Sequence, residues 1–269
     1  GHRLAVEALA RSGAQQRNLG CCRGLFNAGQ GCCFMGRYKE GAGYLAESLE
    51  IAREIKNDGR AAAALQLLGM ASLGQGDLAT ARGHLEEALC LARGVGNKRE
   101  LAAAINALAQ LHRLDGNLAE AEPLYADSLE LARDLGDREI IAIALLNLAM
   151  VAISRQAHDD ARAMLLETLA LAEEIGSKPA GLSALEVSAA LAVSRENWEC
   201  AGRLSAAADV QRAHTGLHRD PADEVFLAPL IAKAQAGAGA DVFVASKLEG
   251  RALSYQEAII QARIWLESK

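Results

Sequence analysis

The sequence predicts an all-α protein: a solenoid of about five helix–turn–helix repeats of 40 residues, closed by a helical C-terminal cap. Three observations support this fold class. The chain matches itself when it is shifted by 40 residues, the helix formers Ala and Leu are abundant, and only 4 prolines occur in 269 residues. We expect residues 1–17 to be the second helix of a truncated preceding repeat, 18–213 the repeats, and 214–269 the cap.

The repeat is visible by direct alignment. Four segments superimpose without gaps, and a degraded fifth copy starts at residue 196; the four are 36–57, 76–97, 116–137 and 156–177. Within them, small residues form one column: Gly41, Ala81, Ala121, Ala161 and Ala201. Four residues later stands a large one: Leu45, Leu85, Tyr125 and Leu165. This spacing puts both columns on one face of a helix, where a second helix can approach closely.

The partner helix precedes that face in each repeat. Its own apolar column contains Leu65, Ile105, Leu145 and Leu185. The pairs Gly76-Asp77 and Gly116-Asn117 separate the helices. Because Gly ends a helix readily and Asp or Asn caps the next one, each repeat should be a helical hairpin.

The period fades near residue 202, where we expect a cap of further helices. Asp220 and Pro221 suit the N-cap and first position of a helix, and Pro229 should kink or split that helix. Ser254 and Glu257 have the spacing of a capping box, which predicts a last helix running to about residue 268.

The repeat resembles the tetratricopeptide family in the residues Leu68, Gly69, Ala81, Leu85 and Ala88. It departs from the family in its 40-residue period, in the missing closing Pro, and in a small-residue column where the family usually has Tyr. A HEAT-type repeat is the alternative. The resemblance implies a right-handed superhelix in which the first helix of each hairpin lines the concave surface.

A second resemblance covers about residues 196–262, through the segments Trp198–Ala207 and Glu249–Ile259. It is to the C-terminus of large bacterial signalling proteins, including transcriptional regulators of the LuxR and SARP kinds. In these, a DNA-binding, cyclase or kinase module precedes a STAND (NB-ARC-like) ATPase and tetratricopeptide repeats. The resemblance implies that this chain is a sensor arm attached to an upstream ATPase module of the same polypeptide.

The N-terminus also fits the repeat register, because residues 1–12 align with the second helix of a hairpin, and no initiator Met is present. We interpret the chain as a fragment of a longer protein. The alternative is a native start with a half-repeat acting as a cap.

Composition excludes several classes. A net charge of -6 with no basic run argues against direct nucleic-acid binding. No apolar run approaches the ~20 residues of a membrane span, and residues 1–12 do not resemble a signal peptide. We therefore expect a cytoplasmic protein that does not bind membranes, in which the six cysteines are reduced.

No catalytic pattern emerges, so we predict that the chain is not an enzyme. It lacks a phosphate-binding Gly-Lys-Ser/Thr loop, a Gly-rich dinucleotide loop and a His-Glu-x-x-His zinc motif. Two groups suggest metal: the cysteine pairs at 21–22 and 32–33, and His214 with His218. Core packing for the cysteines and an exposed loop for the histidines explain them better. We expect no metal and no cofactor.

The predicted concave groove offers the candidate site. Its non-packing positions carry amide, thioether and guanidinium groups: Arg23, Asn27, Gln30, Gln66, Met70, Asn106, Gln110, Arg113, Asn147 and Met150. Amides bond to an extended peptide backbone and Met adapts to varied apolar groups, so we expect a protein, a peptide or a small effector there. The alternative is that these side chains are merely solvated or packed.

Three functions remain. The leading hypothesis is a sensor arm in bacterial signal transduction or transcription regulation. A free-standing adaptor that mediates protein–protein interaction through the groove is the second, and an enzyme is the least supported.

Overall fold

The computed structural model describes residues 2–9 and 16–268, and within them the chain forms fourteen helices and no strand. The predicted all-helical repeat fold is therefore confirmed. Contacts divide the chain into two compact units. The first contains Gly1–Leu135 together with His218–Ala222, and the second contains Gly136–Leu217 together with Asp223–Lys269. This division falls between the third and fourth hairpins and was not predicted from the repeat pattern.

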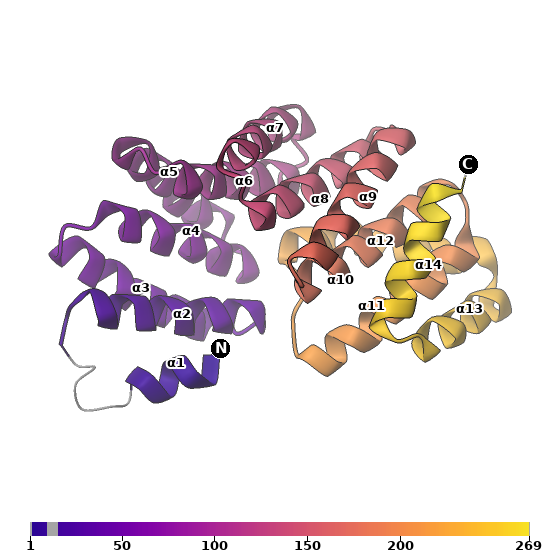
Figure 1. Ribbon diagram of the computed structural model, residues 1–269, viewed down its shortest axis with the longest axis horizontal. Helices are drawn as coiled ribbons and strands as arrows, with labels where there is room; N and C mark the ends of the chain where they lie inside the picture. The colour runs from indigo at the N-terminus through magenta and orange to yellow at the C-terminus, as the bar shows by residue number, and fades with distance from the viewer. Residues whose placement is uncertain (1, 10–15, 269) are drawn as a thin grey trace. The chain divides into compact units, whose positions relative to one another are not determined.

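The first unit is a stack of three helical hairpins preceded by one short helix (Figure 1). The hairpins pair α2 with α3, α4 with α5, and α6 with α7, and α1 packs on α2. The helices are α1 (His2–Leu9), α2 (Leu19–Phe34), α3 (Tyr38–Glu54), α4 (Asp58–Gly74), α5 (Leu78–Val95), α6 (Lys98–Leu114) and α7 (Leu118–Leu135).

A left-handed backbone residue recurs every twenty residues and ends a helix each time. Its φ lies between 53° and 78° at all ten positions: Gly36, Lys56, Gly76, Gly96, Gly116, Gly136, Gln156, Gly176, Glu196 and Gly216. Seven of the ten are Gly, which adopts this conformation without the steric cost that a Cβ brings. The turns that the sequence predicted at Gly76 and Gly116 thus belong to a longer series.

The turn at Gly76 shows how one residue ends a helix while the next starts another. Gly76 N donates to the carbonyl of Leu73 and Asp77 N to that of Ser72, both at 3.0 Å. This pair of bonds is the Schellman motif, which satisfies carbonyls at the end of α4. The Asp77 carboxylate then accepts from Thr80 N at 3.0 Å and caps α5. The chain reverses with almost no loop.

Small residues let the two helices of a hairpin approach closely, as the alignment predicted. The column from Gly41 to Ala201 is buried in every repeat. A Cβ at Gly41 would lie 2.9 Å from Cys33 Sγ and 3.0 Å from the carbonyl oxygen of Gly29, so only glycine fits there without a shift. The glycines of the first hairpin thus bring α2 and α3 together.

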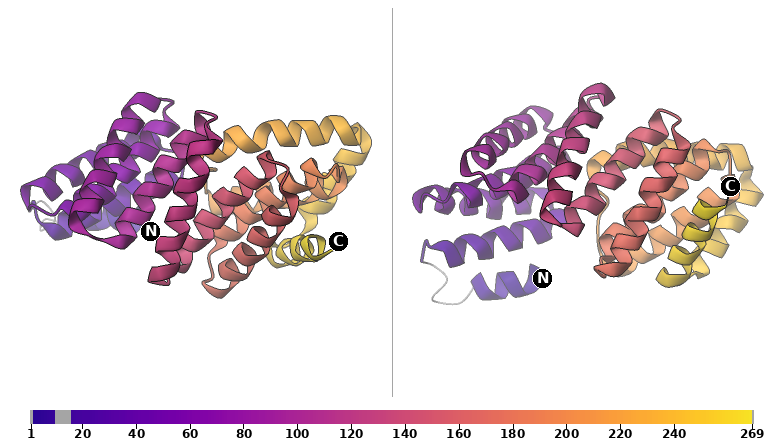
Figure 2. Two further views of the ribbon diagram at one scale, coloured as in Figure 1. Left: turned by 90° about the horizontal axis from the view of Figure 1, so that it is seen from above. Right: turned by 45° about the horizontal axis from the view of Figure 1, so that its top comes forward.

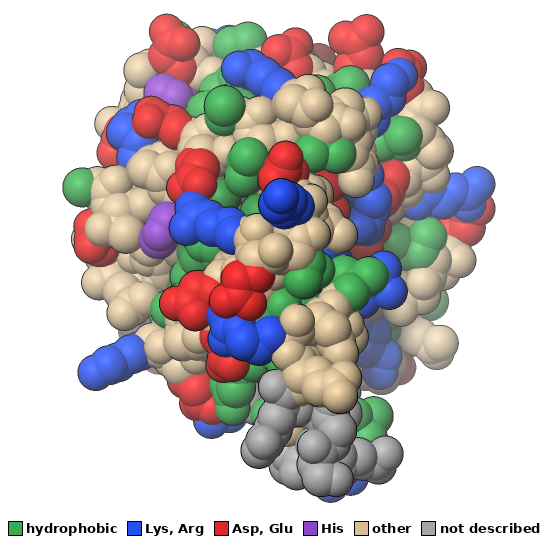
Figure 3. Space-filling model, turned by 90° about the vertical axis from the view of Figure 1, so that its left-hand side faces the viewer, with side chains coloured by type: hydrophobic (Ala, Val, Ile, Leu, Met, Phe, Trp, Pro, Cys, Tyr) green, Lys and Arg blue, Asp and Glu red, His purple; other side chains and the backbone are tan. Residues whose placement is uncertain are grey.

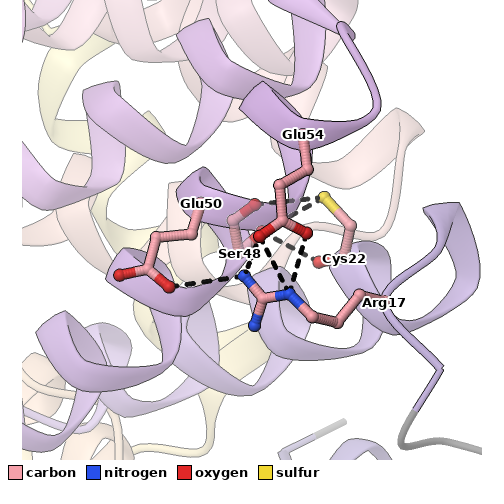
Figure 4. A network of polar contacts seen from close by, with 5 residues as sticks. All are labelled: Arg17, Cys22, Ser48, Glu50 and Glu54. Atoms are coloured by element: carbon pink, nitrogen blue, oxygen red, sulfur yellow. Dashed lines mark hydrogen bonds and ion pairs between the residues drawn. The ribbon is translucent and has the colours of Figure 1, made fainter.

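Polar bonds between helices supplement this packing (Figure 4). Ser48 Oγ on α3 donates to the carbonyl of Cys22 on α2 at 2.9 Å, and Ser128 makes the equivalent bond to Ala102 two repeats later. At the surface, Arg17 Nη2 lies 2.7 Å from Glu54 Oε1 and lowers the pKa of that carboxyl by hydrogen bonding. The buried serines are satisfied without water, which is what a buried hydroxyl requires.

The second unit contains two more hairpins and the cap (Figure 2). Its helices are α8 (Arg138–Ser154), α9 (His158–Glu174), α10 (Lys178–Ser194), α11 (Trp198–Thr215), α12 (Pro221–Ala238), α13 (Ala240–Ala252) and α14 (Tyr255–Glu267). One apolar core joins them, since Leu227, Phe243 and Leu266 of the last three helices cluster with residues of α8 to α11.

Glycine also sets the contact between α11 and α13. A Cβ at Gly250 would overlap the carbonyl oxygen of Arg203, and one at Gly202 would lie 3.1 Å from the Cβ of Ser246. Trp198 likewise covers Gly237. Several residues that carry the C-terminal resemblance therefore have a structural role: they close the stack.

Two expectations for the cap are confirmed, and of the kink or split expected at Pro229, the split does not occur. Asp220 Oδ1 accepts from Ala222 N at 2.8 Å at the start of α12, and the capping box of Ser254 and Glu257 opens α14. However, α12 runs through Pro229 without a break. The proline leaves only one helical carbonyl, that of Val225, without its N–H partner, and Val225 is exposed, so water can satisfy it.

No described helix is both long enough and apolar enough to cross a membrane.

We predict opposite effects of exchanging glycine in and out of the left-handed positions. Gln156→Gly should raise the free energy of unfolding by about 0.5–1 kcal/mol, because it relieves a strained φ, and Gly76→Ala should lower it by about 1 kcal/mol. Gly76 is the matched case because no atom lies within 4 Å of the added Cβ. Urea unfolding followed by circular dichroism measures both. Two changes of the same sign would contradict the proposed role of these turns.

Candidate ligand-binding face

The candidate face lies in the first unit, where the first helices of its hairpins run side by side. Both α2 and α6 contact α4. Because each of these helices uses one side to pack on its hairpin partner, the residues of another side are free to form a shared surface. Eight predicted groove residues lie on these three helices: Arg23, Asn27, Gln30, Gln66, Met70, Asn106, Gln110 and Arg113.

Their exposure decreases from α2 to α6. Arg23 and Asn27 are exposed, Asn106 and Arg113 are buried, and the others are half-buried: Gln30, Gln66, Met70 and Gln110. The accessible part of the face therefore has guanidinium, amide and thioether groups, which can bond to a peptide backbone and cover an apolar side chain.

The other two predicted groove residues lie elsewhere. Asn147 and Met150 belong to α8 in the second unit, and they are only 2% and 1% exposed. Both make contacts within the protein. Their side chains are thus not open to a ligand in this structure. The same holds for the buried Asn106 and Arg113, so the other six predicted residues of the first unit form the accessible part of the candidate face.

Arg113 is held by the protein itself. Its Nε donates to the hydroxyl of Tyr125 at 3.1 Å, and its Nη1 donates to the carbonyl of Ala222, also at 3.1 Å. Ala222 is 109 positions further along the chain. Sequence reasoning could not find this partner, because no repeat relates the two residues.

The same distant segment, residues 218–222, makes a second backbone contact in the first unit. His218 N donates to the carbonyl of Phe34 at the end of α2, at 2.8 Å, and its ring lies next to Gly36. Burial, followed by the charge of Asp220, raises the pKa of Tyr38 to about 12. One end of the face therefore already binds backbone groups of residues 218–222, which are the end of the loop before α12 and the first residues of that helix.

A cationic group at the start of α4, the middle helix of the face, escaped the sequence prediction. The Arg60 guanidinium on α4 stacks on the Phe26 ring of α2, with Cζ 4.4 Å from the ring centroid. Glu100 on α6 is close enough to interact with this charge, while burial raises the pKa of its carboxyl. Arg60 and Glu100 occupy equivalent positions 40 residues apart, and that periodicity was the signal that could have identified them.

The second unit has an internal ion pair on the equivalent helices. Arg212 of α11 binds Glu186 of α10 in bidentate fashion, with Nε to Oε1 at 2.6 Å and Nη2 to Oε2. The Glu186 side chain is 4% exposed and that of Arg212 is 14% exposed. Glu186 stands in the repeat column of Gln66. In the second unit the side chain at this repeat position is thus bound within the protein and is not available to a ligand.

The described residues contain no group of three or more His, Cys, Asp or Glu side chains arranged to hold a metal ion. Within that same part of the chain, all six cysteines are free thiols. His214 lies in the last turn of α11 and His218 follows it, and both are exposed. Burial raises the pKa of Cys33 and of Cys200 to about 12, so neither supplies a thiolate nucleophile at neutral pH.

Charges are mixed on the end of the first unit that Figure 3 draws. Acidic and basic side chains are interspersed there, and no broad basic area gathers on that face. Most of the ion pairs of the first unit are exposed, such as Arg53 with Glu87 and Arg82 with Asp115. Such pairs contribute little to stability, at most about 1 kcal/mol each.

Comparisons with known proteins agree with this architecture. The family model described as tetratricopeptide repeat matches residues 22–93 and 100–174. Among solved structures, BtubC from P. vanneervenii superimposes with a TM-score of 0.56 at 18% identity, covering 81% of this chain and 90% of that one. A Rap protein complexed with competence and sporulation factor gives a TM-score of 0.65 at 13% identity, covering 98% of this chain and 69% of that one. Identities this low establish the fold alone. The comparison with curated proteins found no match.

We predict that removing one partner of the Glu186–Arg212 pair is far more costly than removing both. Arg212→Met leaves a buried carboxylate without its cation and should lower the free energy of unfolding by about 3–5 kcal/mol. Arg212→Met combined with Glu186→Leu should recover at least half of that loss. Thermal and urea unfolding of the two single variants and the double variant test this cycle. Additive single effects would show that the two side chains do not act as a pair.

Proposed function

The chain belongs to the tetratricopeptide repeat family, and on that premise we propose that the face of α2, α4 and α6 binds a peptide or an exposed segment of a partner protein. The observation that carries the proposal is the binding of residues 218–222 at one end of this face. His218 N and the Ala222 carbonyl both bond there as backbone groups. A surface that already binds its own chain in this way has the chemistry to bind another chain beside it.

The open part of the face suits an extended ligand. Asn27 and Gln66 each offer an amide that both donates and accepts, which matches the alternating donors and acceptors of a peptide backbone. Met70 follows Gln66 by one turn on α4, and its flexible side chain adapts to apolar groups of different shapes. The complex of a Rap protein with competence and sporulation factor gives an example of this fold with a bound factor.

We further propose that binding at this face serves regulation. In this reading the chain is a cytoplasmic sensor arm of a bacterial signalling protein, and an upstream ATPase module of the same polypeptide responds to the ligand. The support is the resemblance of residues 196–262 to the C-terminal ends of such proteins. Gly250 and Trp198 pack against other residues of this region. The resemblance to the signalling proteins therefore supports a common helical cap more directly than a common signalling activity. The free-standing adaptor remains the alternative, and the small effector remains an alternative ligand.

The test is selection from a random dodecapeptide library displayed on phage. We expect enriched peptides to bind the protein with measurable affinity by fluorescence anisotropy. The triple variant Asn27→Ala, Gln66→Ala, Gln110→Ala should weaken that binding by at least about tenfold, because three backbone-binding amides are lost at ~1 kcal/mol or less each.

The matched control places three alanines on the second helices of the same hairpins, at the exposed residues Glu47, Glu86 and Asp127. It should leave the affinity unchanged. Failure to enrich any peptide would count against peptide binding, and binding that only the control variant weakens would place the site on the opposite side of the hairpins. A thermal shift caused by a small metabolite, without any peptide binding, would favour the small effector.

A further inference from the structure

The second unit contains a small cavity that is separate from the candidate face. It lies between the start of α11 and the second half of α14, two helices that contact each other (Figure 1). Its volume is about 240 Å³. Pockets for drug-sized ligands usually measure ~300–1,000 Å³, so this cavity suits a smaller molecule. No residue of its wall belongs to α2, α4 or α6, so a ligand here is independent of the proposed peptide.

Gln261 contributes a hydrogen-bond acceptor that the protein leaves unused. It lines the cavity from α14, and its Oε1 is buried without a hydrogen-bond partner among the described residues. A buried oxygen in this state destabilises the folded chain, because it has lost its contact with water and gained no donor. A ligand that brings an N–H group into the cavity can satisfy it.

The wall of the cavity carries a net negative charge. Its charged side chains are Glu199 and Arg203. Glu249 neutralises Arg203, whose Nε donates to Glu249 Oε2 at 2.9 Å and whose Nη2 lies 2.8 Å from the same oxygen. Glu199 has no ion pair within the described residues, and its uncompensated carboxylate favours a cation. The charged residues within two positions of the wall add no net charge: Arg195, Glu196, Arg263 and Glu267.

The two helix ends at the cavity do not change this balance. α11 begins there, with Asn197 Oδ1 accepting from Cys200 N at 3.2 Å as the cap, and α14 ends two residues after Trp265. A helix N-terminus carries about half a positive charge and a C-terminus about half a negative charge. These contributions oppose each other, so the carboxylate of Glu199 decides the sign of the preferred ligand.

The rest of the wall suits a compact hydrocarbon group beside the cation. Trp265 is half-buried, and the face of an indole ring attracts cations and also packs on apolar groups. Leu204 is 1% exposed and adds an aliphatic surface. A metal ion fits less well, because burial raises the pKa of Cys200 to about 12 and leaves Glu199 as the only unpaired anionic ligand among the lining residues.

We propose that this cavity binds a small primary amine. The ammonium group forms an ion pair with Glu199 and donates to Gln261 Oε1, while the hydrocarbon part packs on Trp265 and Leu204. A primary ammonium carries three N–H donors, which is enough for both acceptors at once. The amine is thus a small ligand of the second unit, bound apart from the peptide.

The experiment titrates the full chain with three amines: n-butylamine, 2-phenylethylamine and tryptamine. Each is compared with the alcohol of the same shape, which has no charge. ¹H–¹⁵N spectra follow the indole N–H signal of Trp265, which is readily assigned because the chain contains 2 tryptophans. We expect at least one amine to shift this signal with a Kd of about 1 mM or below, and its alcohol to bind at least about tenfold more weakly.

Two variants test the named side chains. Glu199→Gln should weaken amine binding by about tenfold, because the charge-assisted bond is lost. The matched control is Glu196→Gln, which removes the same charge from an exposed residue outside the wall and should leave the affinity unchanged. Gln261→Leu should weaken binding by about threefold to tenfold without lowering the thermal midpoint, because the acceptor that it removes makes no hydrogen bond in the protein.

Thermal melts by circular dichroism establish that each variant is folded. Absence of binding by all three amines, equal binding of amine and alcohol, or Glu199→Gln binding as tightly as the wild type would each overturn the proposal. The triple variant of the face, Asn27→Ala, Gln66→Ala, Gln110→Ala, should bind the amine like the wild type. Loss of amine binding in that variant would place the amine on the candidate face and overturn the cavity site, whereas failure of the peptide selection would leave it standing.

Discussion

A left-handed residue at every twentieth position is the constraint on which the rest of this structure depends. Each such residue ends one helix, and the residue after it starts the next, so the chain reverses at fixed intervals. Because the helices are therefore of nearly equal length, every hairpin presents its small-residue column at the same height. Close packing follows from this register, and it is what allows Gly41 and Ala81 to be buried between the helices.

The same constraint produces the candidate face. Hairpins of equal length place α2, α4 and α6 side by side, and residues 40 positions apart become neighbours. The side chains that α2, α4 and α6 present on this face can differ from repeat to repeat without changing the fold. At the end of α6, Arg113 is bound by the chain's own Ala222, whereas Arg60 at the start of α4 lies over the Phe26 ring and interacts with the charge of Glu100. In the second unit the repeat column of Gln66 carries Glu186, which Arg212 neutralises. One repeat position is thus half-buried at Gln66 on the candidate face and fully occupied by an internal ion pair at Glu186.

Local features were predictable from the sequence because they arise from neighbouring residues. The period, the turns at Gly76 and Gly116, and the capping box at Ser254 all follow from helix-ending and helix-capping preferences. Features that depend on contacts between distant segments of the chain could not be predicted from the sequence. Nothing near Arg113 points to Ala222, and no local pattern shows that Asn147 and Met150 are buried or that the units divide after Leu135. Helix propensity alone did not predict that α12 continues past Pro229.

Backbone chemical shifts from nuclear magnetic resonance measure this constraint at each residue, since they report the sign of φ. We predict left-handed shifts at all ten positions from Gly36 to Gly216, including the three that are not glycine, with helical shifts between them. Helical shifts that continue through Lys56, Gln156 or Glu196 would contradict it, because the helices would then not reverse at equal intervals and the aligned row of first helices would not form.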